Sequence, residues 1–143
     1  MIGKTFDQLS IGDADQFSKT VTEADIYLFA GITGDFNPAH INEAYAQETF
    51  FKTRIAHGML SAGFISAVIG TRLPGPGTVY LHQALDFLAP VRIGDTVTAE
   101  VAVVEKMADK KRIRLKTVCV NQDGVQVLAG EALVSPPRPP RTA

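Results

Sequence analysis

An acid and a histidine stand five residues apart in the stretch T-G-D-F-N-P-A-H-I-N-E-A-Y-A, residues 33–46. Gly34 and Pro38 set the path of this loop, and the Asn37 side chain can stiffen the turn by bonding nearby backbone. Such a turn can bring Asp35 and His40 to one side of the loop. A carboxylate beside an imidazole raises the imidazole pKa and fixes the orientation of the ring. The pair can therefore hold one water between a general base and a general acid.

Spacing alone does not show that the pair is catalytic. An aspartate and a histidine are common in turns, and Asp35 could have no role other than capping the loop. Metal binding is not expected. The other two histidines, His57 and His82, are far away in the sequence, no H-x-x-x-H spacing occurs, and the single cysteine, Cys119, cannot form a thiolate cluster.

The composition is that of one ordinary globular domain. The chain has 143 residues, of which 45% are hydrophobic and 20% charged, and its formal charge is −1. That charge gives no general attraction to nucleic acid or to an anionic membrane. The N-terminus lacks the apolar core of a signal peptide, and the longest apolar run, residues 55–70, is too short to span a bilayer. A cytoplasmic protein is expected.

The first half of the chain is predicted to be helical. Thr22 and Asp25 resemble an N-terminal cap that opens a helix over residues 23–33, and Asn42 can cap a second helix over 43–51. The third helix, residues 55–70, is apolar on nearly every face and rich in small residues. Such a helix is expected to be enclosed by the rest of the protein.

The second half is predicted to form strands, because residues alternate between apolar and polar with many β-branched side chains. The expected strands cover residues 78–87, 96–105, 112–120 and 126–134. No helix separates them, so the sheet is expected to be antiparallel and wrapped around the buried helix, an α+β fold. Residues 1–134 form the single domain in this prediction, and the proline-rich residues 135–143 form an extended, mobile tail. The open side of such a sheet predicts a homodimer.

The order of residues in Y-L-F-A-G-I-T-G-D-F-N-P-A-H-I-N-E-A-Y-A resembles the signature of the MaoC-like, hydratase-2 family, the (R)-specific enoyl-CoA hydratases. The motifs A-H-G-M-L at 56–60 and L-P-G-P-G-T-V-Y at 73–80 extend the likeness, which runs from about Thr22 to Val134. The small single-domain hydratases that supply monomers for polyhydroxyalkanoate synthesis look most similar. Ala39 departs from the pattern, which more often has Val, Leu or Ile there.

The resemblance implies a hot-dog fold, a dimer, and hydration of a trans-2-enoyl-CoA to an (R)-3-hydroxyacyl-CoA without any cofactor besides the coenzyme A of the substrate. It implies that Asp35 and His40 hold the attacking water, with Asp35 as base and His40 as proton donor to Cα, although the roles can be exchanged. It implies that the Gly58 backbone N–H stabilises the thioester oxygen, at the start of the buried helix. His57 is expected to be a structural partner of a carbonyl group rather than a second acid.

Four further residues complete the expected site. Asn37 is expected to position the acid–histidine pair, and the resemblance implies that Ser66, Ile69 and Val134 line the acyl-chain pocket, with plain core packing as the alternative. Basic residues should meet the coenzyme A phosphates, and the available ones are Lys52, Arg54, Arg92 and Lys110–Arg112.

Three alternative functions remain open from the sequence. The first is a dehydratase acting on another acyl-CoA or on an acyl-carrier-protein thioester. The second is a hot-dog thioesterase, and the third is a non-catalytic acyl-CoA-binding module.

Overall fold

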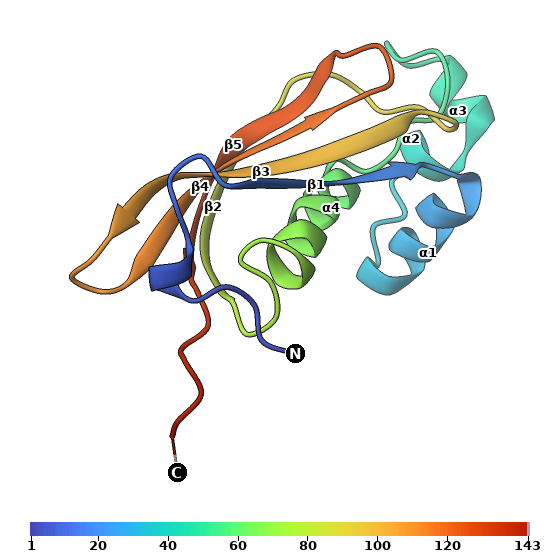
Figure 1. Cartoon of the computed structure of the whole chain (residues 1–143). Coiled ribbons are helices and arrows are strands. Elements are labelled where there is room, and N and C mark those ends of the chain that lie inside the picture. The colour runs from blue at the N-terminus through green and yellow to red at the C-terminus, as the bar shows by residue number, and fades with distance from the viewer. Residues whose placement is uncertain (143) are drawn as a thin grey trace.

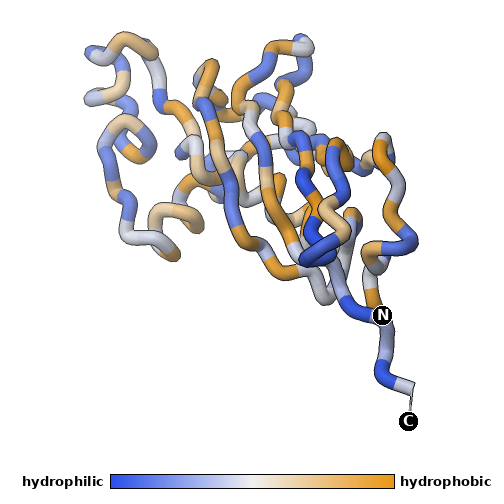
Figure 2. Tube along the Cα trace, turned by 90° about the vertical axis from the view of Figure 1, so that its left-hand side faces the viewer, coloured by the Kyte–Doolittle hydropathy of each residue, from blue (hydrophilic) through white to orange (hydrophobic). Residues whose placement is uncertain are grey.

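The computed structural model describes residues 1–142, and its centre is a sheet of five antiparallel strands in the order β1-β3-β4-β5-β2. A short 3₁₀ helix, Phe6–Gln8, precedes the first strand. The strands are β1 (Ala14–Thr20), β2 (Val79–Phe87), β3 (Thr96–Met107), β4 (Arg112–Val120) and β5 (Gln126–Ser135). All four strands predicted from the alternation are confirmed, with ends within two residues. Figure 2 shows the alternation as orange and blue positions following one another along the strands.

Helix α4 (Gly58–Thr71) lies against one face of the sheet, below it in Figure 1. Phe64, Ile65, Val68 and Ile69 of this helix are buried, and they pack against the inward-facing side chains of the strands. The sheet around one central helix is the hot-dog arrangement that the resemblance predicts.

The expectation that α4 is enclosed on every side is wrong for the single chain. Met59, Gly63, Ser66 and Gly70 recur at helical spacing and form an exposed face, because the sheet covers only the opposite side of the helix. The small residues on this open face leave room for another backbone to approach closely.

Three short helices, α1 (Glu23–Thr33), α2 (Pro38–Ile41) and α3 (Glu43–Gln47), gather at one end of the molecule, beside the start of α4 (Figure 1). The Thr22 hydroxyl accepts the Asp25 N–H and the Asp25 carboxylate accepts the Thr22 N–H, which is the predicted capping box. The Asn42 cap is also confirmed, but α3 ends at Gln47, well before residue 51.

Besides the short 3₁₀ helix, two elements of the first half were not predicted. Strand β1 is one, so the expectation of helices throughout that half is wrong. β1 is an edge strand whose side chains are polar or small except for Phe17, and its alternation is therefore weak in the sequence. The other is α2, a single turn.

The C-terminal residues follow β5 without regular secondary structure. Pro136 and Pro137 are buried, and Pro137 packs beside Gly77, while Arg138 and the residues after it that are described are exposed. The first prolines of the predicted tail thus belong to the packed domain, and Ala143 lies outside the described residues.

Candidate active site

The loop after α1 presents Asp35. Gly34 ends the helix in the left-handed conformation, with φ of 81°, and its N–H donates to the Ala30 carbonyl at 2.8 Å. Glycine suits this position because it adopts positive φ without strain. The chain therefore turns sharply at Gly34 and leaves the next residue, Asp35, exposed.

Asn37 connects the acid to the histidine. Its side-chain oxygen accepts the Ala39 N–H at 3.0 Å and so caps α2, while its own N–H donates to the Asp35 carboxylate at 3.2 Å. Pro38 fits the first position of α2 because its ring presets a helical φ and no N–H is needed there. This turn places His40 on the same side of the loop as Asp35, in contact with the segment that leads into α4.

His40 is held as a neutral base. Its Nδ1–H donates to the Ile55 carbonyl at 2.7 Å, because a carbonyl can only accept, and Nε2 is left as the acceptor. Burial lowers the pKa of His40, and the neighbouring His57 lowers it further. The Ile55 carbonyl and Asp35 act in the opposite direction without restoring the ordinary value. His40 therefore offers a nitrogen lone pair at neutral pH.

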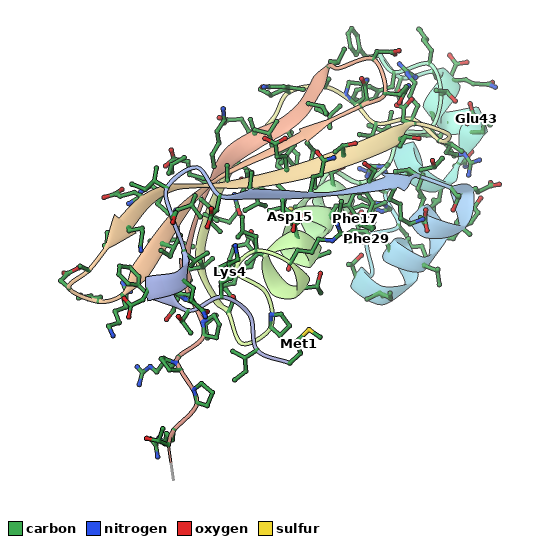
Figure 3. The ribbon with its side chains drawn as sticks, viewed as in Figure 1. Met1, Lys4, Asp15, Phe17, Phe29 and Glu43 are labelled. Atoms are coloured by element: carbon green, nitrogen blue, oxygen red, sulfur yellow. The ribbon has the colours of Figure 1, made fainter. Side chains whose placement is uncertain are left out.

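His57 joins this pair from the segment before α4. Its ring centroid is 3.9 Å from that of His40 and 4.7 Å from that of Phe29, and only 2% of the residue is exposed. Phe29, labelled in Figure 3, reaches this contact from α1. The Nε2–H of His57 donates to the Asp35 backbone carbonyl at 3.0 Å, and the described residues supply no partner for Nδ1. This bond to a carbonyl is the structural role expected for His57.

One ligand atom from each of Asp35, His40 and His57 lies within 4.8 Å of the others, so these are the residues that a cation would meet. Sequence distance concealed this, because His57 is 17 residues beyond His40. The rings of His40 and His57 are tilted by 33° to one another, and each donates one ring N–H to a backbone carbonyl. The other nitrogen of each ring remains as an acceptor.

Gly58 is the first residue of α4, and its backbone is exposed. The first N–H groups of a helix have no partner within the helix, and the helix dipole adds partial positive charge there. A Cβ at this position would lie 2.6 Å from two atoms of the Phe87 ring, so only glycine allows the ring to lie over this backbone.

His40 and Gly58 line the same cavity, whose volume is about 400 Å³. Its other lining residues come from the segment before α4, from α4 itself and from the strand ends nearby. They are Phe50, Phe51, Ile55, Ala56, Ser61, Phe87, Leu88, Ala89, Pro90, Val91, Val127 and Leu128. The cavity therefore joins a histidine and a helix start to a mostly apolar chamber. Phe50, Ser61 and Phe87 were not predicted, since only the folded chain brings these separate segments together.

Ser66, Ile69 and Val134 lie outside this lining. Ser66 is exposed on the open face of α4, whereas Ile69 and Val134 are almost completely buried in the core. Their role toward an acyl chain stays a prediction.

Some of the basic residues available for phosphate groups already have partners. Arg54 donates to Glu23 at 2.7 Å, to Glu43 at 3.2 Å and to the Tyr27 hydroxyl at 2.8 Å, and so ties α1 and α3 to the segment before α4. Glu43 is labelled at this end of the molecule in Figure 3.

Arg92 donates to the Phe51 carbonyl at 2.9 Å, and Lys52 is exposed. Lys110 and Lys111 lie in the turn between β3 and β4, at the other end of the sheet (Figure 1).

Fold and site together define a hot-dog protein with an acid–histidine loop set against the start of its central helix. Residues 9–126 match the model of the MaoC-like domain. The chain therefore belongs to the MaoC-like family. The chain is 58% identical over 132 residues to an (R)-specific enoyl-CoA hydratase of Rhodospirillum rubrum, with 92% of this chain and 91% of that protein covered.

Two more relatives agree with this assignment. A 3-hydroxybutyryl-CoA dehydratase of Methylorubrum extorquens is 51% identical, with 93% of this chain and 84% of that protein covered. The unliganded R-hydratase of Pseudomonas aeruginosa superposes with a TM-score of 0.90 at 43% identity and covers 99% of this chain and 97% of its own. The similarity thus extends over nearly the whole of each protein.

Proposed function

We propose that this protein catalyses the reversible, (R)-specific hydration of a trans-2-enoyl-CoA to an (R)-3-hydroxyacyl-CoA. The observation that carries the proposal is a single cavity with a neutral histidine and a free helix N–H on its wall, next to an exposed carboxylate. The names of the Rhodospirillum and Methylorubrum relatives describe the two directions of such a reaction.

In the proposed mechanism, one water lies between the Asp35 carboxylate and His40 Nε2. The water oxygen attacks Cβ of the enoyl thioester while Nε2 takes one water proton, and the imidazolium then gives that proton to Cα. Asp35 stays charged, orients the water and stabilises the imidazolium. The neutral state of His40 favours His40 as the base. The sequence analysis had assigned that role to Asp35.

Negative charge moves onto the thioester oxygen as the water attacks. The Gly58 N–H at the start of α4 is the proposed donor to that oxygen, since a preorganised donor binds the developing charge more strongly than the neutral carbonyl. Because water and proton act from the same side of the substrate, both are added to one face of the double bond. That geometry supports a single stereochemical product, and no cofactor takes part.

The proposed assembly is a homodimer. β2 is an edge strand with exposed apolar side chains at Val79 and Leu81, and α4 also has an open face in the single chain. Pairing two copies would cover both surfaces. The proposal places Ser66, Ile69 and Val134 along the acyl chain in that assembly. It also includes a cytoplasmic location, and the described residues contain no helix that is long and apolar enough to cross a membrane.

Dehydration of an acyl-carrier-protein thioester is the second candidate, because the same pair of residues would serve it. Arg54 and Arg92 are occupied by protein partners, so these two guanidinium groups do not favour coenzyme A over the carrier protein. Comparing the two thioesters of one acyl chain as substrates decides between them.

The decisive experiment follows crotonyl-CoA by the absorbance of its conjugated thioester. Loss of absorbance without release of thiol supports hydration, whereas release of thiol would mean a thioesterase. No change with C4 to C12 substrates would leave only a binding module. Asp35→Asn and His40→Gln are each expected to lower kcat by about 10²-fold or more. Asp123→Asn, in the exposed turn after β4, is the control and should keep full activity.

A further inference from the structure

Ser61 places a hydroxyl in the wall of the active-site cavity. Only 3% of the residue is exposed, and it lines the same cavity as His40 and Gly58. Its backbone carbonyl accepts the Cys119 S–H at 3.6 Å, but the described residues supply no hydrogen-bond partner for its hydroxyl. Apart from His40, every other side chain of the lining is apolar. Besides His40, the Ser61 hydroxyl is therefore the polar side-chain group that this chamber offers to a ligand.

The helix geometry directs the Ser61 hydroxyl toward Gly58. The two residues are three positions apart on α4 and so lie on one side of the helix. Side chains on a helix lean toward its N-terminus, and the patch that a residue covers lies over the preceding turn. The hydroxyl of Ser61 is therefore expected to lie over the turn that begins at Gly58, whose N–H has no acceptor within the helix.

We propose that Ser61 is a second donor to the thioester carbonyl oxygen, beside the Gly58 N–H. The inference rests on the proposed hydratase function and adds a residue to it. An acyl chain offers no acceptor to a hydroxyl in an apolar wall, whereas the thioester oxygen is an acceptor and comes to the start of α4. Its negative charge grows when water adds to Cβ, so the hydrogen bond from Ser61 strengthens in the transition state. Ser61 thus acts mainly on kcat.

The kinetic test compares Ser61→Thr with Ser61→Val in the hydration of crotonyl-CoA, because the two side chains share a shape and differ in the hydroxyl. The Thr variant is expected to exceed the Val variant by about 10- to 100-fold in kcat, with a smaller difference in KM. Ser61→Ala should fall with Val while its melting temperature stays near that of the unchanged protein. Thr71→Ala is the control. It removes a hydroxyl at the far end of α4 that donates to the Ala67 carbonyl, and it should keep full activity.

A spectroscopic test reads the hydrogen bond itself. Donors to the carbonyl polarise a bound enoyl thioester and move its absorption to longer wavelength. In an Asp35→Asn background, which slows turnover, adding Ser61→Ala is expected to reduce this shift for bound crotonyl-CoA. Equal kcat for the Thr and Val variants, or an unchanged shift, would overturn the role of Ser61 and leave the hydratase function intact. If the protein without any substitution hydrates no enoyl thioester, both the role of Ser61 and the hydratase function are overturned.

Discussion

Replacing Gly58 by alanine should separate stability from activity. The new methyl group would lie 2.6 Å from two atoms of the Phe87 ring, about 1 Å closer than carbon atoms normally approach. Phe87 is 55% exposed, so its ring can turn away at a cost of about 0.5–1.5 kcal/mol. Alanine in a helix gains up to about 1 kcal/mol over glycine. The two effects nearly cancel, and the free energy of unfolding should change by less than ~1 kcal/mol.

Activity should fall much further, because the methyl group and the displaced ring both occupy the space through which the thioester oxygen reaches the Gly58 N–H. Loss of one such donor typically costs about 10²- to 10³-fold in kcat. The assay combines urea unfolding with hydration of crotonyl-CoA on the same preparations. Gly31→Ala in α1 is the matched control, since a Cβ there meets no atom within 4 Å, and it should keep full activity. Turnover by Gly58→Ala near that of the unchanged protein would refute the oxyanion role.

Two further predictions concern protonation and assembly. Since burial lowers the pKa of His40, kcat/KM should be constant above about pH 7 and should fall as the pH drops below the ordinary histidine value of about 6.5. An activity that instead declines above pH 6.5 would make His40 the acid and Asp35 the base. Gel filtration with light scattering should give the mass of a dimer, and Leu81→Asp on the edge of β2 should release single chains. The mass of one chain for the unchanged protein would rule out the dimer.

The sequence predicted most successfully those features that depend on local pattern. Strands β3 to β5 were found because each has a buried face, which gives alternation, and α1 was found because its capping box is local. Strand β1 was missed, since an edge strand has little to bury and carries residues such as Asp15 and Lys19. The cavity wall was also missed. Phe50, Ser61 and Phe87 come from three elements, and nothing in the sequence shows that they face one space.

The site itself consists of two segments that fix each other. His40 of the first segment donates to the Ile55 carbonyl of the second at 2.7 Å, and His57 of the second donates to the Asp35 carbonyl of the first at 3.0 Å. The Ile55 N–H also donates to the Ala39 carbonyl at 3.2 Å. Each backbone thus sets the ring orientation of the other segment's histidine, and the two rings stack between them.

These mutual hydrogen bonds explain why neither the Asp35–His40 turn nor the Ile55–Gly58 segment forms the site alone. The turn that holds Asp35 and His40 presents an acid and a base, but Nε2 of His40 is defined as the free nitrogen only when the Ile55 carbonyl accepts the hydrogen bond from Nδ1–H. The segment that supplies Ile55 continues through His57 into Gly58, so the same few residues that fix the base also place the oxyanion donor. Arg54 ties that segment to α1 and α3 through Glu23 and Glu43. The same hydrogen-bonded segment therefore positions base and oxyanion donor relative to one another, as the addition of water across a double bond requires.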